Sequence, residues 1–221
     1  MPWVDGVLLF GAFLVSLSVH ECAHAWTAWK QGDYTGVAEG RVSLNPLRHI
    51  DPFGTVLLPL VLMFGPWNSS GKYGIPFGYA KPVPYNPYVF KNPATGMALV
   101  AAAGPLSNVF LAVGTAAVLG ALHRSGAGDG TVGMRLLEML VPLNVRLAVF
   151  NLIPIAPLDG SSILAAALPR GAARAMGGFE RYGFLVLIAL SATGLLARIT
   201  GPVERALLDP LSVLAGRSFL G

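Results

Sequence analysis

The first long apolar stretch, residues 3–29, contains His20, Glu21 and His24 in the pattern H-E-x-x-H. A stretch of this length can cross the hydrocarbon layer of a membrane, which takes about 20 helical residues. Ionisable side chains at that depth cost roughly 2.5 kcal/mol or more each unless they are paired or coordinated, and they mark functional sites. The remainder of the chain must therefore fold so that it brings a partner to this group.

The spacing of the two histidines indicates what that partner is. On a helix, residues i and i+4 lie on the same face, so His20 and His24 present two imidazole nitrogens to one point. One helix supplies two ligands to a tetrahedral zinc ion at this spacing, and Glu21 is placed to reach a water in the open coordination position. Zinc lowers the pKa of its bound water to about 7, and we expect Glu21 to take the proton.

The composition places the whole chain in the membrane class. Of its 221 residues, 54% are hydrophobic and only 12% are charged, whereas soluble domains carry about 25% charged residues. The sequence predicts an all-α polytopic membrane protein of about four to six transmembrane helices, folded as one membrane-embedded domain over residues 1–221. The net charge of +4 indicates topology and headgroup contact rather than nucleic-acid binding. Five apolar stretches occur, at residues 3–29, 53–67, 94–122, 136–158 and 182–199.

A third ligand is predicted at the end of the fourth stretch. Asp159 lies there in the sequence NLIPIAPLDG, which begins at Asn151. A carboxylate in such a place can belong to an ordinary helix-terminal turn. Together with H-E-C-A-H, however, we interpret Asp159 as the oxygen ligand that completes a His₂Asp site with water in the fourth position.

This ligand set constrains the path of the chain. The histidines lie near the end of the first stretch and Asp159 at the end of the fourth, so the two helices must run in the same direction. Residues 94–122 supply one crossing between them. The short stretch 53–67, which contains prolines and glycines, then either dips into the membrane or crosses and returns through the proline-rich residues 68–93. We expect a re-entrant or β-hairpin segment beside the site, which accepts an unwound substrate by strand addition; the alternative is an interfacial loop.

Two asparagines on the apolar stretches also need partners. Asn108, in the sequence GPLSN that begins at Gly104, and Asn151 are buried amides. They either hydrogen-bond between helices, or bind the substrate backbone or the oxyanion of a tetrahedral intermediate. Gly104 allows close helix packing.

The positive-inside rule favours a cytoplasmic location for the end of the first stretch that carries H-E-C-A-H, because most lysines and arginines then lie on the cytoplasmic side.

The motifs H-E-C-A-H, G-P-L-S-N and N-L-I-P-I-A-P-L-D-G occur in this order on hydrophobic segments, and the chain resembles the site-2 proteases, the intramembrane zinc metalloproteases of peptidase family M50. The resemblance extends to GRVSLNPLRHIDPFGT and GYAKPVPYNP, as in compact prokaryotic members without PDZ or CBS domains. It implies one zinc ion held by His20, His24 and Asp159, with Glu21 as general base. It also implies a transmembrane protein substrate cut within or near its membrane segment, in a prokaryotic cell membrane. Asn108 and Asn151 match asparagines of the family motifs.

Two other functions compete with proteolysis. A non-proteolytic adaptor would bind transmembrane partners without cutting them, but it has no physical need for Glu21. A metal-ion transporter would need several ligand sites along a path and a repeat between halves, and His49 and His123 stand alone instead.

Overall fold

The computed structural model of the chain describes residues 2–64, 80–126, 130–178 and 180–220. These residues form helices and irregular segments, with no strand among them. The longer helices are α1 (Pro2–Lys30), α4 (Pro93–Arg124), α5 (Val132–Asn151), α8 (Glu180–Ala192) and α9 (Leu195–Ala215). The shorter ones are α2 (Thr35–Ala38), α3 (Leu58–Phe64), α6 (Asp159–Ala167) and α7 (Arg170–Gly178), with 3₁₀ turns η1 (Pro46–Arg48) and η3 (Pro87–Val89) and a π-helical turn η2 (Pro52–Leu57).

The helix ends follow from local sequence signals. The side chain of Asn92 accepts a hydrogen bond from the amide of Thr95, and Pro93 occupies the first helical position, so α4 begins there. The prediction of one apolar helix over residues 136–158 is wrong in its extent. Helix α5 ends at Asn151, shortly before Pro154 and Pro157, which have no amide hydrogen to continue a helix.

The apolar stretch 182–199 also differs from its prediction. It is divided between α8 and α9, which are separated by a turn ending at Gly194. Gly194 has a φ of 69°, in the left-handed region that glycine adopts without strain. The last predicted stretch therefore supplies parts of two helices rather than one continuous segment.

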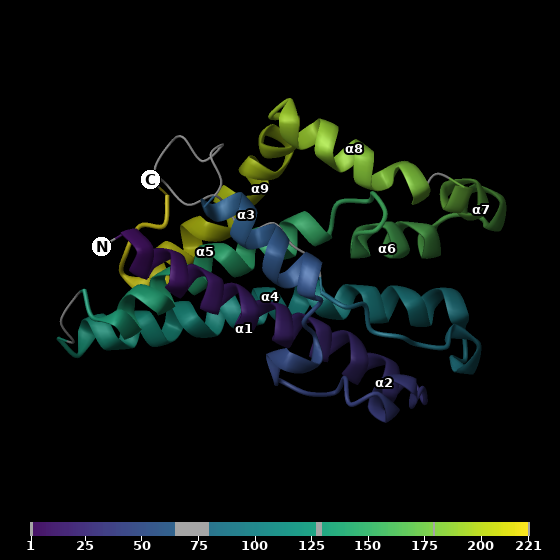
Figure 1. Ribbon diagram of the computed structural model, residues 1–221, viewed down its shortest axis with the longest axis horizontal. Coiled ribbons are helices and arrows are strands. Elements are labelled where there is room, and N and C mark those ends of the chain that lie inside the picture. The colour runs from purple at the N-terminus through teal and green to yellow at the C-terminus, as the bar shows by residue number, and fades with distance from the viewer. Residues whose placement is uncertain (1, 65–79, 127–129, 179, 221) are drawn as a thin grey trace.

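Helices α1, α4 and α5 form the centre of the molecule (Figure 1). In Figure 1, α1 and α5 run in the same direction, and α4 runs in the opposite direction. Helix α9 packs on the other side of α4 and α5. The largest core cluster joins α4, α5 and α9 and a second one joins α1 to α5; their fully buried members include Ala12, Phe13, Ala112, Ala116, Leu119 and Val141. This arrangement lets the end of α1 and the end of α5 reach the same region.

Two of the helices are long and apolar enough to cross a membrane, Val4–Lys30 and Pro93–Arg124. A third span results if Gly171–Gly178 and Arg181–Ala192, which are inclined by 70°, are taken together. These apolar helices are those of a membrane protein, as the composition predicts.

The region predicted to dip or form a hairpin is described in part. Its first half is helical, in η2 and α3, and begins where Asp51 accepts hydrogen bonds from the amides of Phe53 and Gly54. Residues 65–79 lie outside the described part of the chain. Residues 80–92 form an irregular segment with one 3₁₀ turn, so the described portion of the predicted β-hairpin contains no strand.

Candidate metal centre

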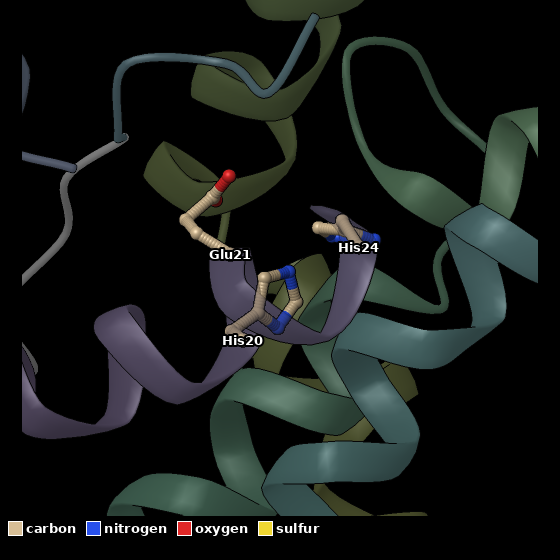
Figure 2. A group of neighbouring side chains, drawn as sticks. All are labelled: His20, Glu21 and His24. Carbon is tan, nitrogen blue, oxygen red and sulfur yellow. The ribbon is translucent and has the colours of Figure 1, made fainter. Parts of the chain in front are cut away.

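His20 and His24 lie one turn apart on α1, and both side chains are buried. Their ring centroids are 4.6 Å apart, in an edge-to-face arrangement. Figure 2 shows the two rings with the Glu21 side chain beside them on the same helix. Each of the three residues offers one ligand atom, and these atoms lie within 4.8 Å of one another. The helical spacing therefore brings together the three side chains of the motif.

The second nitrogen of each histidine is bound by α4. The Nδ1 atom of His20 lies 2.6 Å from Oδ1 of Asn108, and Nδ1 of His24 lies 2.7 Å from the carbonyl oxygen of Val100. A carbonyl oxygen only accepts hydrogen bonds, so each Nδ1 carries the hydrogen and donates it. The Nε2 lone pairs of both rings are then directed away from these partners and are available to a metal.

Asp159, the first residue of α6, faces these two nitrogens. Its Oδ2 lies 3.2 Å from Nε2 of His20, and its Oδ1 lies 3.5 Å from Nε2 of His24. The Oδ2 atom is buried and accepts no hydrogen bond from the described residues. Two ligand atoms that each lie about 2.0–2.2 Å from a tetrahedral ion are about as far from each other as these oxygen and nitrogen atoms are. Two imidazole nitrogens and a carboxylate with an unsatisfied oxygen therefore fit a zinc ion.

Gly104 leaves the room that this group needs. A Cβ atom on Gly104 would lie 2.4 Å from Nε2 of His24 and 2.5 Å from Nε2 of His20. The sequence predicted a packing role for this glycine. The structure shows in addition that a side chain at this position would collide with Nε2 of His20 and of His24.

The predicted asparagines lie in different environments. Asn108 is fully buried and bonds to His20, and its Nδ2 donates to Oδ1 of Asn144 at 2.7 Å. This geometry favours the interhelical alternative for Asn108. Asn151 is partly exposed and donates to the carbonyl oxygen of Leu147, one turn back, at 3.0 Å. Asn144, fully buried on α5, is a residue that sequence reasoning missed. The sequence did contain a signal for Asn144, namely an amide side chain within an apolar stretch. The same signal singled out Asn108 and Asn151.

The segment 80–92 is held near the end of α1 by two buried charged residues. Arg41 is 2% exposed, and its guanidinium donates to the carbonyl oxygens of Arg48, Lys81 and Pro82 at 2.6, 3.2 and 2.9 Å. These bonds join the loop that follows α2 to the start of the segment. An always-charged group with donors in a fixed fork suits several carbonyl acceptors at once.

Asp33 supplies the other connection, just beyond the end of α1. Its Oδ1 accepts from the amide and hydroxyl of Thr35 at 3.0 and 2.6 Å, and its Oδ2 accepts from the amide of Asn86 at 2.7 Å. In the same segment, burial and the charge of Asp159 raise the pKa of the Tyr85 hydroxyl. In the described segment 80–92, Tyr85 is thus near enough to Asp159 to feel its charge.

Comparison with known proteins adds independent findings. The profile described as "Peptidase family M50" matches residues 127–191. The Bacillus subtilis (strain 168) protein named "Putative zinc metalloprotease YwhC" is 37% identical over 210 residues, which cover 93% of this chain and 90% of that protein. The Mycolicibacterium smegmatis protein named "Putative zinc metalloprotease Rip2" is 31% identical over 87% of this chain and 69% of its own length. A Mycobacterium tuberculosis (strain H37Rv) protein of the same name is 29% identical over 83% and 66%. No solved structure matches the chain.

Proposed function

The chain belongs to peptidase family M50, the site-2 protease family, and we propose that this membrane zinc metalloprotease hydrolyses a peptide bond within or near a transmembrane segment of its protein substrate. The observation that carries the proposal is the convergence of His20, His24 and Asp159 on one buried point. That point lies near the end of a helix long enough to span a membrane. A protease site placed there is reached most directly by a substrate that also lies in the membrane.

Each residue of the centre has a distinct proposed role. His20 and His24 hold one zinc ion through their Nε2 atoms, and Asp159 holds it through a carboxylate oxygen. When bound, zinc supplies a Lewis acid and a water whose pKa lies near neutrality. Glu21, next to His20 and 9% exposed, accepts the proton of the attacking water as general base.

The substrate is proposed to lie along the segment 80–92. A peptide bond in an intact helix is shielded, so the substrate must unwind, and its freed backbone groups then need hydrogen-bond partners. An irregular segment that is held close to the centre by Asp33 and Arg41 is suited to provide them. Asn151, which is partly exposed, remains our proposal for a substrate-binding amide. For Asn108, which is fully buried, we propose that its contact is with His20 instead.

The proposal extends to the architecture. We propose one domain over residues 1–221 with about four to six membrane crossings, of which α1 and α4 are long and apolar enough on their own. A further part of this proposal is that residues 53–67 re-enter the membrane rather than cross it. The parallel course of α1 and α5 supports a shared depth for the histidines and Asp159 (Figure 1). The end of α1 is proposed to face the cytoplasm.

The decisive experiment compares membrane-protein fragments in cells that carry the wild type, Glu21→Gln or Glu39→Gln, by terminus-resolved mass spectrometry. Glu21→Gln keeps the size of the side chain and removes the base. Glu39 is exposed and lies outside the centre, so its variant is the matched control. We expect fragments that end inside transmembrane segments to be absent from Glu21→Gln cells alone. Equal profiles for wild type and Glu21→Gln, with equal expression, would favour the adaptor function.

A further inference from the structure

Asn144 lies in the middle of α5, fully buried, and its amide orientation is determined by its neighbours. Its Nδ2 donates to the carbonyl oxygen of Leu140 at 2.8 Å and to the hydroxyl oxygen of Ser16 at 2.9 Å. The carbonyl oxygen only accepts. The Ser16 hydroxyl donates its own hydrogen to the carbonyl oxygen of Ala12 at 2.7 Å, so it also acts as an acceptor here. The amino group of Asn144 must face these two atoms, and its Oδ1 faces the other way.

That direction is toward Asn108 on α4. Oδ1 of Asn144 accepts from Nδ2 of Asn108 at 2.7 Å, and Oδ1 of Asn108 then faces Nδ1 of His20 at 2.6 Å. If the side-chain amide of Asn108 were rotated by 180°, its Oδ1 would face Oδ1 of Asn144 in a buried site, and two unpaired acceptors there are costly. Its amino group would then point at His20, favour a lone pair on Nδ1 and leave the hydrogen on Nε2.

We propose that Asn144 is a positioning residue that keeps His20 in the tautomer with hydrogen on Nδ1 and the lone pair on Nε2, acting through Asn108. The chain of hydrogen bonds runs from α5 through α4 to α1, so it also links the rotations of the three central helices. In the described part of the chain, the side chain of Asn144 hydrogen-bonds to Asn108, Ser16 and Leu140, and not to His20 or Asp159. Its proposed effect on the metal therefore passes through the side chain of Asn108. The proposal rests on the role of His20 as a zinc ligand.

The first test measures zinc affinity by chelator competition on the purified full chain. Outer partners of metal-bound histidines typically contribute 10- to 100-fold to metal affinity. We expect Asn144→Leu, which is similar in volume and has no donor or acceptor, to bind zinc about 10-fold more weakly than the wild type. Val141→Ala is the matched control, because Val141 is equally buried on α5 one turn away but belongs to the apolar core. It should lower the melting temperature and leave zinc affinity unchanged.

A double-mutant comparison separates positioning from general loss of stability. If Asn144 acts through Asn108, Asn144→Leu should cause no further loss of zinc affinity in an Asn108→Leu background. Wild-type zinc affinity for Asn144→Leu, or an equal loss in both backgrounds, would overturn the proposal. Should Asn144→Leu not fold, Asn144→Ala serves in the same comparison with the same expected direction.

The second readout does not involve the metal. Nitrogen NMR of metal-free protein labelled at its four histidines reports which ring nitrogen carries the hydrogen. Without zinc, Oδ2 of Asp159 lies 3.2 Å from Nε2 of His20 and favours hydrogen on Nε2 in the wild type and in Asn144→Leu alike. We therefore expect a larger share of the Nδ1-protonated tautomer of His20 in the wild type than in Asn144→Leu; an equal share would contradict the proposal. His20→Ala is the separate test of the ligand set. If that variant retains zinc, the proposed ligand set fails, while the tautomer result still decides the role of Asn144.

Discussion

At the scale of single residues, the absence of a side chain at Gly104 is as important for the candidate centre as the proposed ligands are. Gly104 brings α4 close to the two metal-facing nitrogens, and Asn108, one turn further along α4, bonds to the back of the His20 ring. The Nδ1 atom of each ring makes a hydrogen bond to α4, so the rings have little freedom to move away from a side-chain atom added at position 104. The same helix thus orients the histidines from behind and leaves space in front of them.

Gly104→Ala should reduce zinc affinity by at least about 10-fold, because the new methyl group displaces Nε2 of His20 or His24 from its position. Gly114→Ala, on the same helix with nothing within 4 Å of the added carbon, is the matched control. It should keep zinc affinity and stabilise the helix by up to about 1 kcal/mol. Zinc titration and thermal melting of both variants measure this. Wild-type zinc affinity in Gly104→Ala would show that the site does not need the close approach.

At the scale of elements, the segment 80–92 contains no strand and is attached by the hydrogen bonds of Asp33 and Arg41 and by the buried side chain of Phe90, which packs in a cluster with Ala28 and Val100. Burial raises the pKa of Asp33, but hydrogen bonds from Thr35 and from the amide of Asn86 outweigh it and hold the pKa below its ordinary value of 3.8. Folding therefore favours the charged form of Asp33. The stability that this carboxylate contributes is complete above its unfolded pKa and is lost as pH falls through the lower folded pKa.

Hydrogen exchange at the amide of Asn86 tests this attachment. After correction for intrinsic exchange rates, we expect constant protection from neutral pH down to about pH 4 and a loss of protection below it. Asp33→Asn should lower protection already at neutral pH, since its amino group cannot accept a hydrogen bond. Asp51→Asn is the control, because Asp51 caps η2 and does not contact Asn86. Protection that is the same in wild type and Asp33→Asn would show that other contacts hold the segment.

At the scale of the whole molecule, the direction of three helices determines which loops share a side of the membrane. Figure 1 shows α2 at one end of the group formed by α1, α4 and α5, and the end of α4 and the start of α5 at the other. Because α1 and α5 are parallel, the histidines and Asp159 are brought to the same end. If α1 and α4 span the membrane, residues 31–51 and 80–92 lie on one side and residue 125 lies on the other.

Single cysteines in a Cys22→Ala background test the proposed orientation. We expect a membrane-impermeant maleimide to label Ser125→Cys in intact cells, and to label Lys91→Cys only in inverted membrane vesicles. Both positions are exposed in the structure, so a lack of labelling reports the membrane rather than burial. Glu21→Gln proteins carrying the same cysteines control for changes caused by activity. The reverse labelling pattern would place the metal centre on the outer side.

Local patterns in the sequence were sufficient for a large part of this description. The i, i+4 spacing of His20 and His24 depends only on helical geometry, which is the same wherever the helix lies. The membrane class follows from composition, and the family follows from the motifs. The parallel course of α1 and α5 was predicted from the need to bring Asp159 to the histidines, because each crossing reverses the direction of the chain. These inferences use properties of one element or of its order in the chain.

The remaining features depend on how helices rotate and slide against one another. The sequence analysis singled out Asn108 and Asn151 as amides on apolar stretches, but it did not identify Asn144 or show which asparagine reaches His20. Likewise, only the tertiary structure places Gly104 against both Nε2 atoms and Asp33 against Asn86. Relative rotation is decided by side chains from all the packed helices together, because close-packed interiors admit few arrangements. The sequence by itself therefore determined which residues are proposed as ligands, and only the packing decided which residues contact and orient them.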